Sequence, residues 1–518
     1  MVWQQDVEEL KFRKQLAAQM GGKENIERHH KRGKLTVRER IQKLVDPGSF
    51  QEIGGLSGTG VYKDNKLESF QPAPLVIGVC TINGRKVVLN GGDFTVRGGA
   101  GDAAVGDKGG FAAHLALDWK LPYVNLLDAA GGSVKTFEKI GRTYIPMNLG
   151  TYRIEELLQT APVVALVLGS VAGLPAVQAC FAHFNIMVKG ISQVFPGGPP
   201  VVKAALGYDI TKEELGDERT QIYEAGVIDN LAETEEEAFE MTRRFLSYLP
   251  QNVWGMPSRI QTDDNPNRRE EKLLSAIPKK RNRNYDSYAI LKQVLDKDSF
   301  FEIAPHYGKS RILGLARANG YPIGVMINNP MFNGGSMDVA AGSKVVRLIE
   351  LCDTFHLPMV YFADEPGFMV GIEAQKSGVV RAGARIVCVT QHSRMPWITF
   401  VIRQLYGVAG QCHDRAMRGM FKRVAWPSAR WGSMHIEGGA TAAYRREIES
   451  APDPEAMRAE IEARLQAIAS PFRTAEAFNI EDIIDPRNTR PIMCDFVETA
   501  QNELTTQLGR TPGLNFLP

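Results

Sequence analysis

Cysteine is scarce in this chain of 518 residues, and no two of its six cysteines stand in a C-x-x-C spacing. A disulfide framework or a zinc knuckle needs paired or closely spaced cysteines, so neither is indicated, and no metal site is predicted. Free and mostly buried thiols are expected instead. The positions are Cys80, Cys180, Cys352, Cys388, Cys412 and Cys494.

Long apolar runs are absent too. No stretch approaches the roughly 18 apolar residues of a membrane-spanning helix. The first fourteen residues are rich in charge and lack the apolar core of a secretory signal. We therefore expect no membrane partner, and a cytoplasmic protein or, in a eukaryote, a mitochondrial matrix protein from which a targeting peptide has been removed.

Charge of one sign is not in excess, since 61 Lys and Arg stand against 59 Asp and Glu, a net charge of +2. This balance argues against nucleic acid as the main partner. In residues 23–43, however, eight basic side chains face three acidic ones. A solvated helix and loop is the favoured interpretation of that segment, and a share in binding a phosphorylated cofactor is the alternative.

The sequence contains two short apolar runs that end in small residues. Residues 121–128 lead into Ala-Ala-Gly-Gly-Ser, and residues 357–364 lead into Glu-Pro-Gly-Phe. Each pattern is typical of a buried parallel strand followed by a sharp turn. Ligands of open α/β sheets bind beyond the carboxyl ends of such strands, so the pair predicts two half-sites.

The two halves of the chain form an internal repeat. Small-residue turns are expected after its last strands, at residues 169–173 and 406–410. The repeat predicts a tandem duplication of one α/β domain, in which strands alternate with helices. The matching segments are 46–53 with 296–303, 82–84 with 318–320, 87–90 with 325–328, and 162–168 with 396–402.

Composition divides the chain into an N-terminal domain (1–250), a linker (251–284) with several prolines and dense charge, and a C-terminal domain (285–518) with a helical, charged tail. Residues 5–45 are expected to be helical. The dipeptide Asn83-Gly84 lies between apolar runs and predicts a hairpin.

The predicted turns are poor in nucleophilic side chains, so the chemistry is expected to come from the backbone. Glycine-rich turns that start helices present N–H groups, which stabilise an anion without any ionisable residue. Two paired turns would hold two anionic oxygens. A single glycine-rich turn such as residues 97–101 is weaker evidence and more often reflects tight packing.

Several separated motifs resemble the carboxyltransferase (β) subunit of biotin-dependent acyl-CoA carboxylases, the propionyl-CoA and methylcrotonyl-CoA carboxylase group. The resemblance runs from about Arg32 to Arg490, which is nearly the whole chain. The motifs occupy residues 32–40, 46–50, 93–96, 199–202, 213–216, 364–368, 406–409 and 484–487.

That resemblance implies a tandem crotonase-like (ClpP/crotonase) fold, with acyl-CoA held by the N-half and biotin by the C-half. Active sites would form between the N-half of one subunit and the C-half of another. Carboxybiotin would release CO2, its ureido nitrogen would remove the α-proton of the thioester, and the enolate would take up CO2 at the α (or vinylogous γ) carbon. The residues carried over by position are Val408 and Ala409 for the enolate oxygen, Ala130 and Gly131 for the ureido oxygen, and Gly132, Gly407 and Gln411 against the substrate.

Several positions depart from the family pattern. Residues 128–133 read Asp-Ala-Ala-Gly-Gly-Ser in place of Asp-Ser-Gly-Gly-Ala, which leaves the register of the N-half donors open by one residue. Val408 replaces a glycine and narrows the approach, although its N–H remains a donor while φ is negative. His435-Ile-Glu437 stand as extra residues. Gln411, an Asp in propionyl-type enzymes, is longer and neutral, so a branched, unsaturated or polar-substituted acyl-CoA is expected.

Other polar side chains are given structural interpretations. His413 could act as a base, but a structural partner near a helix start is favoured. Cys412 is expected to pack in the core. Asp364 and Glu365 could form a carboxylate pair, but neighbours on a turn point apart, and capping of the next helix is favoured.

Two further functions stay open, namely a biotin-dependent acyl-CoA decarboxylase subunit and a non-enzymatic assembly subunit. No biotin-attachment motif of the Ala-Met-Lys-Met type and no ATP-grasp segment occurs, so a separate biotin carboxylase or biotin carboxyl carrier subunit is implied. A homo-oligomer, from a dimer to a hexamer, is expected because equivalent turns of duplicated domains would face the same way within one chain.

Overall fold

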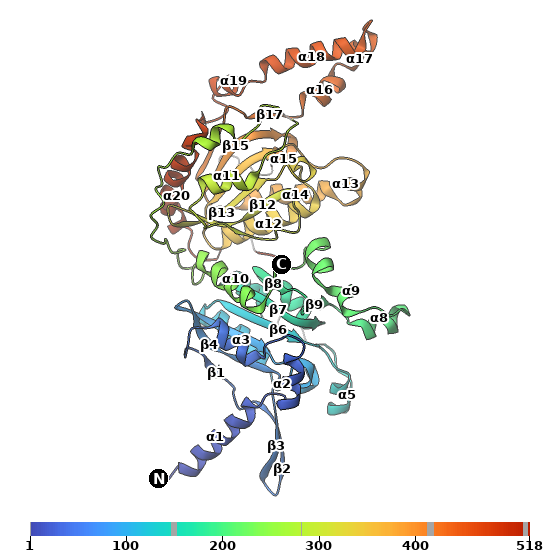
Figure 1. The fold of residues 1–518 in the computed structure, drawn as a ribbon, viewed down its shortest axis with the longest axis vertical. Coiled ribbons are helices and arrows are strands. Elements are labelled where there is room, and N and C mark those ends of the chain that lie inside the picture. The colour runs from blue at the N-terminus through green and yellow to red at the C-terminus, as the bar shows by residue number, and fades with distance from the viewer. Residues whose placement is uncertain (1, 147–152, 281, 412–418, 511–515) are drawn as a thin grey trace. The chain divides into compact units, whose positions relative to one another are not determined.

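The computed structural model describes residues 2–146, 153–280, 282–411, 419–510 and 516–518. It divides into two compact units, one up to Gly255 and the other Met256–Leu517 (Figure 1). Within the described residues, no helix is long and apolar enough to cross a membrane. The same residues contain no cluster of three or more His, Cys, Asp or Glu side chains that could hold a metal ion.

The first unit is built on one mixed sheet. Its strand order is β1-β4-β5-β6-β7-β8-β10, with β9 paired to the end of β7. From β5 to β10 the neighbouring strands run parallel, whereas β1, β4 and β5 pair antiparallel. The strands are β1 (Gln51–Ile53), β4 (Leu75–Ile82), β5 (Arg85–Gly92), β6 (Tyr123–Ala129), β7 (Val163–Ala172), β8 (Phe184–Val188), β9 (Gln193–Phe195) and β10 (Asn230–Ala232), and β2 (Gly58–Lys63) and β3 (Lys66–Pro72) form a separate hairpin.

Helices cover both faces of this sheet. Alternation along β6 turns Asn125 toward α4 (Lys108–Trp119) and α7 (Leu174–Cys180) on one face and Asp128 toward α3 (Val37–Leu44) on the other. The expected helical stretch 5–45 consists of three helices, α1 to α3. The helices are α1 (Gln4–Ala18), α2 (Lys23–His30), α3 (Val37–Leu44), α4 (Lys108–Trp119), α5 (Lys135–Ile140), α6 (Ile154–Leu158), α7 (Leu174–Cys180), α8 (Pro199–Leu206), α9 (Lys212–Gly216) and α10 (Glu235–Tyr248).

The second unit repeats this design. Its sheet has the order β11-β12-β13-β14-β15-β16-β18, with β17 paired to the end of β15. Its core gathers apolar side chains from the strands and from α11 and α20. The strands are β11 (Phe301–Glu302), β12 (Arg311–Ala318), β13 (Tyr321–Asn328), β14 (Met359–Glu365), β15 (Trp397–Tyr406), β16 (Phe421–Ala425), β17 (Arg430–Gly432) and β18 (Asp482–Ile483).

The second unit carries more helix between β17 and β18 than the first unit carries between β9 and β10. Helices α16 to α18 stand beyond β17 (Figure 1) and share a small apolar cluster of their own around Ala440, Ile448 and Ile461. The helices are α11 (Ser287–Val294), α12 (Val339–Thr354), α13 (Ile372–Lys376), α14 (Val379–His392), α15 (Gly407–Gln411), α16 (Ile436–Ala443), α17 (Arg445–Ser450), α18 (Pro454–Ile468), α19 (Pro471–Glu476) and α20 (Thr489–Thr505).

The repeat extends to individual hydrogen bonds. Asp46 accepts the N–H groups of Asn83 and Gly84 at 2.9 and 2.8 Å, in the tight turn between β4 and β5. Asp296 accepts the N–H groups of residues 319 and 320 at 3.1 and 2.7 Å in the equivalent turn. Both turns have positive φ at their two central residues, as two-residue hairpins of this kind require. The predicted hairpin and the duplication are therefore confirmed.

One predicted turn is wrong. Residues 169–172 continue β7, and the chain turns only at Gly173, whose φ is +65°. The counterpart of Gly173 is Gly407, with φ +62° at the end of β15. Gly169 is small for another reason, since a Cβ there would lie 2.0 Å from a carboxylate oxygen of Asp128.

Candidate active site

The turn after β6 is fixed by its own backbone hydrogen bonds. The Ala130 N–H donates to the carbonyl oxygen of Gly98 at 2.9 Å, and the Gly101 N–H donates to that of Gly131 at 2.8 Å. Gly131 has φ +79°, and a Cβ there would lie 2.3 Å from the carbonyl oxygen of Ala172. This position therefore requires glycine.

The same hydrogen bonds bear on the donors expected from the sequence. Because the Ala130 N–H already has an acceptor, it is not free to meet a ligand oxygen in this conformation. The Gly132 N–H has no acceptor among the described residues, and a Cβ on Gly132 would meet no atom within 4 Å. The open donor shown at this turn is thus Gly132, two residues later than Ala130.

A buried ion cluster lies directly beneath this turn. Asp128 is fully buried, with the Lys34 ammonium 3.2 Å and the Arg40 guanidinium 3.1 Å from its carboxylate oxygens. Arg40 also pairs with Glu235 of α10 at 2.6 Å. The favoured view of residues 23–43 as solvated is therefore wrong for these two bases. Neither is exposed to receive a phosphate.

His29 completes the cluster. It is almost fully buried, and its Nε2 lies 3.1 Å from the carbonyl oxygen of Leu35 and 3.8 Å from Asp128. A carbonyl oxygen only accepts, so Nε2 carries the proton. Burial lowers the pKa of His29 to about 4, which Asp128 offsets only in part. His29 is consequently neutral near pH 7.

The turn after β14 rests on a second buried ion cluster. The Asp364 carboxylate accepts from Arg403 and Gln404 at 3.0 Å and from the Tyr285 hydroxyl at 2.8 Å. Its neighbour Glu365 pairs with Arg311 and accepts the N–H of Gly367 at 3.1 Å. Both acids lie in β14, are fully buried and take part in ion pairs. The role expected for them, capping of the next helix, is therefore wrong.

The helix turn of the second unit begins at Gly407. Val408, with 58% of its surface exposed, and Ala409, with 1%, follow in the first turn of α15. Gln411 is exposed at the end of the described segment. Cys412 and His413 lie outside the described residues.

The sequence reasoning missed the cations that hold the two aspartates. Lys34 and Arg40 stand inside the motif at residues 32–40, and Arg403 stands in β15. The signal available was the acid at the end of each central strand and, for the first strand, the basic residues in the motif at residues 32–40. No periodicity gives the contact itself, because Arg40 and Asp128 are 88 residues apart.

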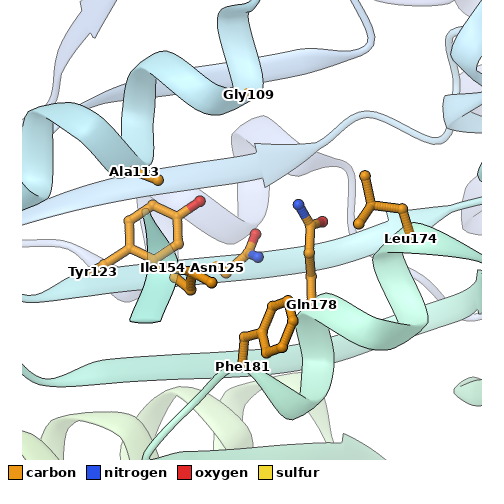
Figure 2. Close-up of a pocket in the computed structure, with 8 residues that line it drawn as sticks. All are labelled: Gly109, Ala113, Tyr123, Asn125, Ile154, Leu174, Gln178 and Phe181. Atoms are coloured by element: carbon orange, nitrogen blue, oxygen red, sulfur yellow. The ribbon is translucent and has the colours of Figure 1, made fainter. Parts of the chain in front are cut away.

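A cavity opens on the other face of β6, between α4 and α7 (Figure 2). Tyr123, Asn125 and Gln178 give it polar groups, and its volume of about 20 Å³ is room for one water molecule. An acyl group is larger than that space, so we do not assign the substrate to it. The other lining residues are Gly109, Ala113, Ile154, Leu174 and Phe181.

Comparison with known proteins agrees with this geometry. The carboxyl transferase domain model matches residues 28–511. The propionyl-CoA carboxylase carboxyltransferase subunit of Haloferax mediterranei is 31% identical over 95% of each chain. The methylmalonyl-CoA carboxyltransferase 12S subunit of Propionibacterium freudenreichii subsp. shermanii is 30% identical, over 98% of this chain and 96% of its own.

The fold has a close counterpart among solved structures. The transcarboxylase 12S crystal structure, described as a hexamer with methylmalonyl-CoA and methylmalonic acid bound, matches with a TM-score of 0.87 and 29% identity. The match covers 96% of this chain and 95% of that one. The expected tandem crotonase-like fold is confirmed. Motifs, duplicated fold and relatives agree, and the chain belongs to the carboxyl transferase domain family.

Proposed function

We propose that this chain is the carboxyltransferase component of a biotin-dependent acyl-CoA carboxylase. It transfers CO2 from carboxybiotin to the α (or vinylogous γ) carbon of an acyl-CoA. The observation that carries the proposal is the pair of glycine turns at Gly131 and Gly407, each with positive φ and each placed beyond a central strand. A reaction that passes through anionic oxygens needs hydrogen-bond donors more than it needs a side-chain base.

The residues of the two turns donate hydrogen bonds to two different oxygens. Val408 and Ala409 direct their N–H groups to the thioester oxygen, on which negative charge develops as the enolate forms. Gly131 and Gly132 direct theirs to the biotin ureido oxygen, in place of the pair Ala130 and Gly131. Bound carboxybiotin supplies the CO2 and the ureido nitrogen that takes the α-proton.

The two units have separate roles in this proposal. The first unit of one subunit holds acyl-CoA and the second unit of another holds biotin, which arrives on a separate carrier protein or domain. In this pairing each turn meets the reacting oxygen of the ligand that the facing unit holds. A second copy of the chain brings the complementary half-site, so the working form is a homo-oligomer. The polar, uncharged side chain of Gln411 and the bulk of Val408 favour a branched, unsaturated or polar-substituted acyl group over acetyl.

The test is a carboxyl-transfer assay with the purified chain, a carboxylated biotin carrier and a series of acyl-CoAs. Malonyl-type products from at least one acyl-CoA are expected, with a higher kcat/KM for propionyl or methylcrotonyl than for acetyl. The Gln411→Asp variant should shift that ratio. Absence of transfer to every acyl-CoA would contradict the function, and preference for acetyl would contradict the role of Gln411.

A further inference from the structure

One side chain joins the two turns at the carboxyl edge of the second unit's sheet. His435 Nε2 lies 2.8 Å from the carbonyl oxygen of Pro366, to which it donates a hydrogen bond. The His435 ring also packs on the ring of Tyr406, with centroids 4.0 Å apart. Pro366 directly follows β14, and Tyr406 is the last residue of β15, so one imidazole contacts the ends of both strands.

The duplication supplies a comparison within the same chain. The end of β7 pairs with β9 in the first unit, and the end of β15 pairs with β17 in the second. Counted along the chain from these two pairings, His435 occupies the position in the second unit that Gly198 occupies in the first. Both residues are the N-cap of the following helix, α8 or α16. Because Gly198 has no side chain, the first unit does not make the corresponding contacts. The residues Pro366, Tyr406 and His435 correspond to Ala130, Ala172 and Gly198.

The contacts of His435 lie next to the donors proposed for the enolate oxygen. Val408 and Ala409 follow Tyr406 by two and three residues. A Cβ on Gly407 would lie 3.4 Å from the carbonyl oxygen of Ser433, so the segment leading to His435 packs on the same turn. Hydrogen-bond donors stabilise a transition state when they are held in place before the reaction, and a misplacement of about 1 Å can cost about 100-fold in rate.

We propose that His435 is a positioning residue for this half-site: by bonding Pro366 and packing on Tyr406, it fixes the start of α15 and so aims the Val408 and Ala409 N–H groups. The inference rests on the proposed carboxyl transfer. The carbonyl oxygen of Pro366 fixes the proton on Nε2, so the hydrogen bond is present in the neutral imidazole.

Two substitutions separate the hydrogen bond from the ring packing. His435→Phe keeps a ring against Tyr406 and removes the donor, whereas His435→Gln supplies an N–H donor without the ring. We expect kcat of His435→Phe to fall about 10-fold or more while KM for acyl-CoA stays within about twofold, because the lost effect acts in the transition state. His435→Gln should recover most of kcat.

A matched control is His392, whose Nδ1 lies 2.9 Å from the carbonyl oxygen of Cys388 at the end of α14. The variant His392→Phe also loses a hydrogen bond to a backbone carbonyl, yet it should leave kcat and KM unchanged. If His435→Phe behaves like His392→Phe, the positioning role is refuted. A loss of kcat that only follows the folded fraction of each variant would refute it too.

A second readout does not depend on activity. Amide hydrogen exchange of residues 364–371 and 404–411 should become faster in His435→Phe than in the native protein, with the melting temperature unchanged. Unchanged exchange at both turns would overturn the inference. If the native protein transfers no carboxyl group, the proposed function fails, and the exchange rates alone then decide whether His435 holds the turns.

Discussion

At the scale of single residues, two buried aspartates support the two turns. Asp128 and Asp364 occupy the same position in the repeat, and each is neutralised by basic side chains from other segments. The sequence showed the two acids at the ends of apolar runs, which placed the half-sites. It did not show which bases meet them, because these contacts join segments far apart in the chain.

The partner of the first aspartate should matter strongly for stability. Arg40→Ala would leave Asp128 and Glu235 buried with less compensation, and breaking such a pair costs about 3–5 kcal/mol. The matched control is Arg38→Ala, which removes a more exposed pair with Glu52 worth about 0–1 kcal/mol. Urea unfolding measures both changes. Equal losses in the two variants would contradict the role given to Arg40.

The buried neutral His29 should make stability depend on pH. Its folded pKa of about 4 lies below the ordinary 6.5, so the unfolded chain binds the proton more readily. The contribution of His29 to the free energy of unfolding is therefore fully present above pH 6.5. It is lost as the pH falls from 6.5 to 4, by about 3 kcal/mol in total. The native protein should lose that much more than His29→Gln over this window in urea unfolding, and parallel curves would refute the assignment.

At the scale of elements, the strand ends and hairpins followed from local sequence rules. Apolar runs on either side of an Asn-Gly turn specify β4, β5 and their counterparts in the second unit. The turn expected at residues 169–173 failed, because small residues in a buried strand give the same local pattern as a turn. Gly169 is small to make room for the Asp128 carboxylate, a tertiary constraint without local signal.

The turn after β6 allows a test with two neighbouring glycines. Gly131→Ala places a Cβ 2.3 Å from the Ala172 carbonyl oxygen at φ +79° and should lower kcat by about 10-fold or more. Gly132→Ala meets open space and keeps its N–H, so its kcat should stay within about threefold of the native value. Steady-state carboxyl transfer compares the two. A larger loss in Gly132→Ala would contradict the geometry of this turn.

At the scale of the whole molecule, the proposed function gives the two units of one duplicated chain half-sites of different chemistry. Gly131 and Gly407 mark them, one in each compact unit. The predicted duplication could be seen in sequence because its turn motifs recur, as at Asp46 and Asp296. The local rules that locate each half-site contain no information on how two half-sites are brought together.

Activity should require more than one copy of the chain. Facing half-sites come from different subunits in the proposed mechanism, so dilution to a monomer should abolish carboxyl transfer. Light scattering coupled to size-exclusion chromatography gives the mass, and the same fractions are assayed. Full activity at the mass of a single chain would contradict the proposal.

The central claim is that backbone N–H groups carry the catalysis, and Ala409→Pro tests it most directly. Proline has no N–H, so the substitution removes the donor at position 409, and its ring does not break a hydrogen bond of the first turn of α15. The control Val408→Ala keeps every N–H and removes only an exposed side chain. We predict that kcat falls about 100-fold or more in Ala409→Pro and stays near the native value in Val408→Ala. Small and equal losses in both, with both proteins folded, would contradict the account.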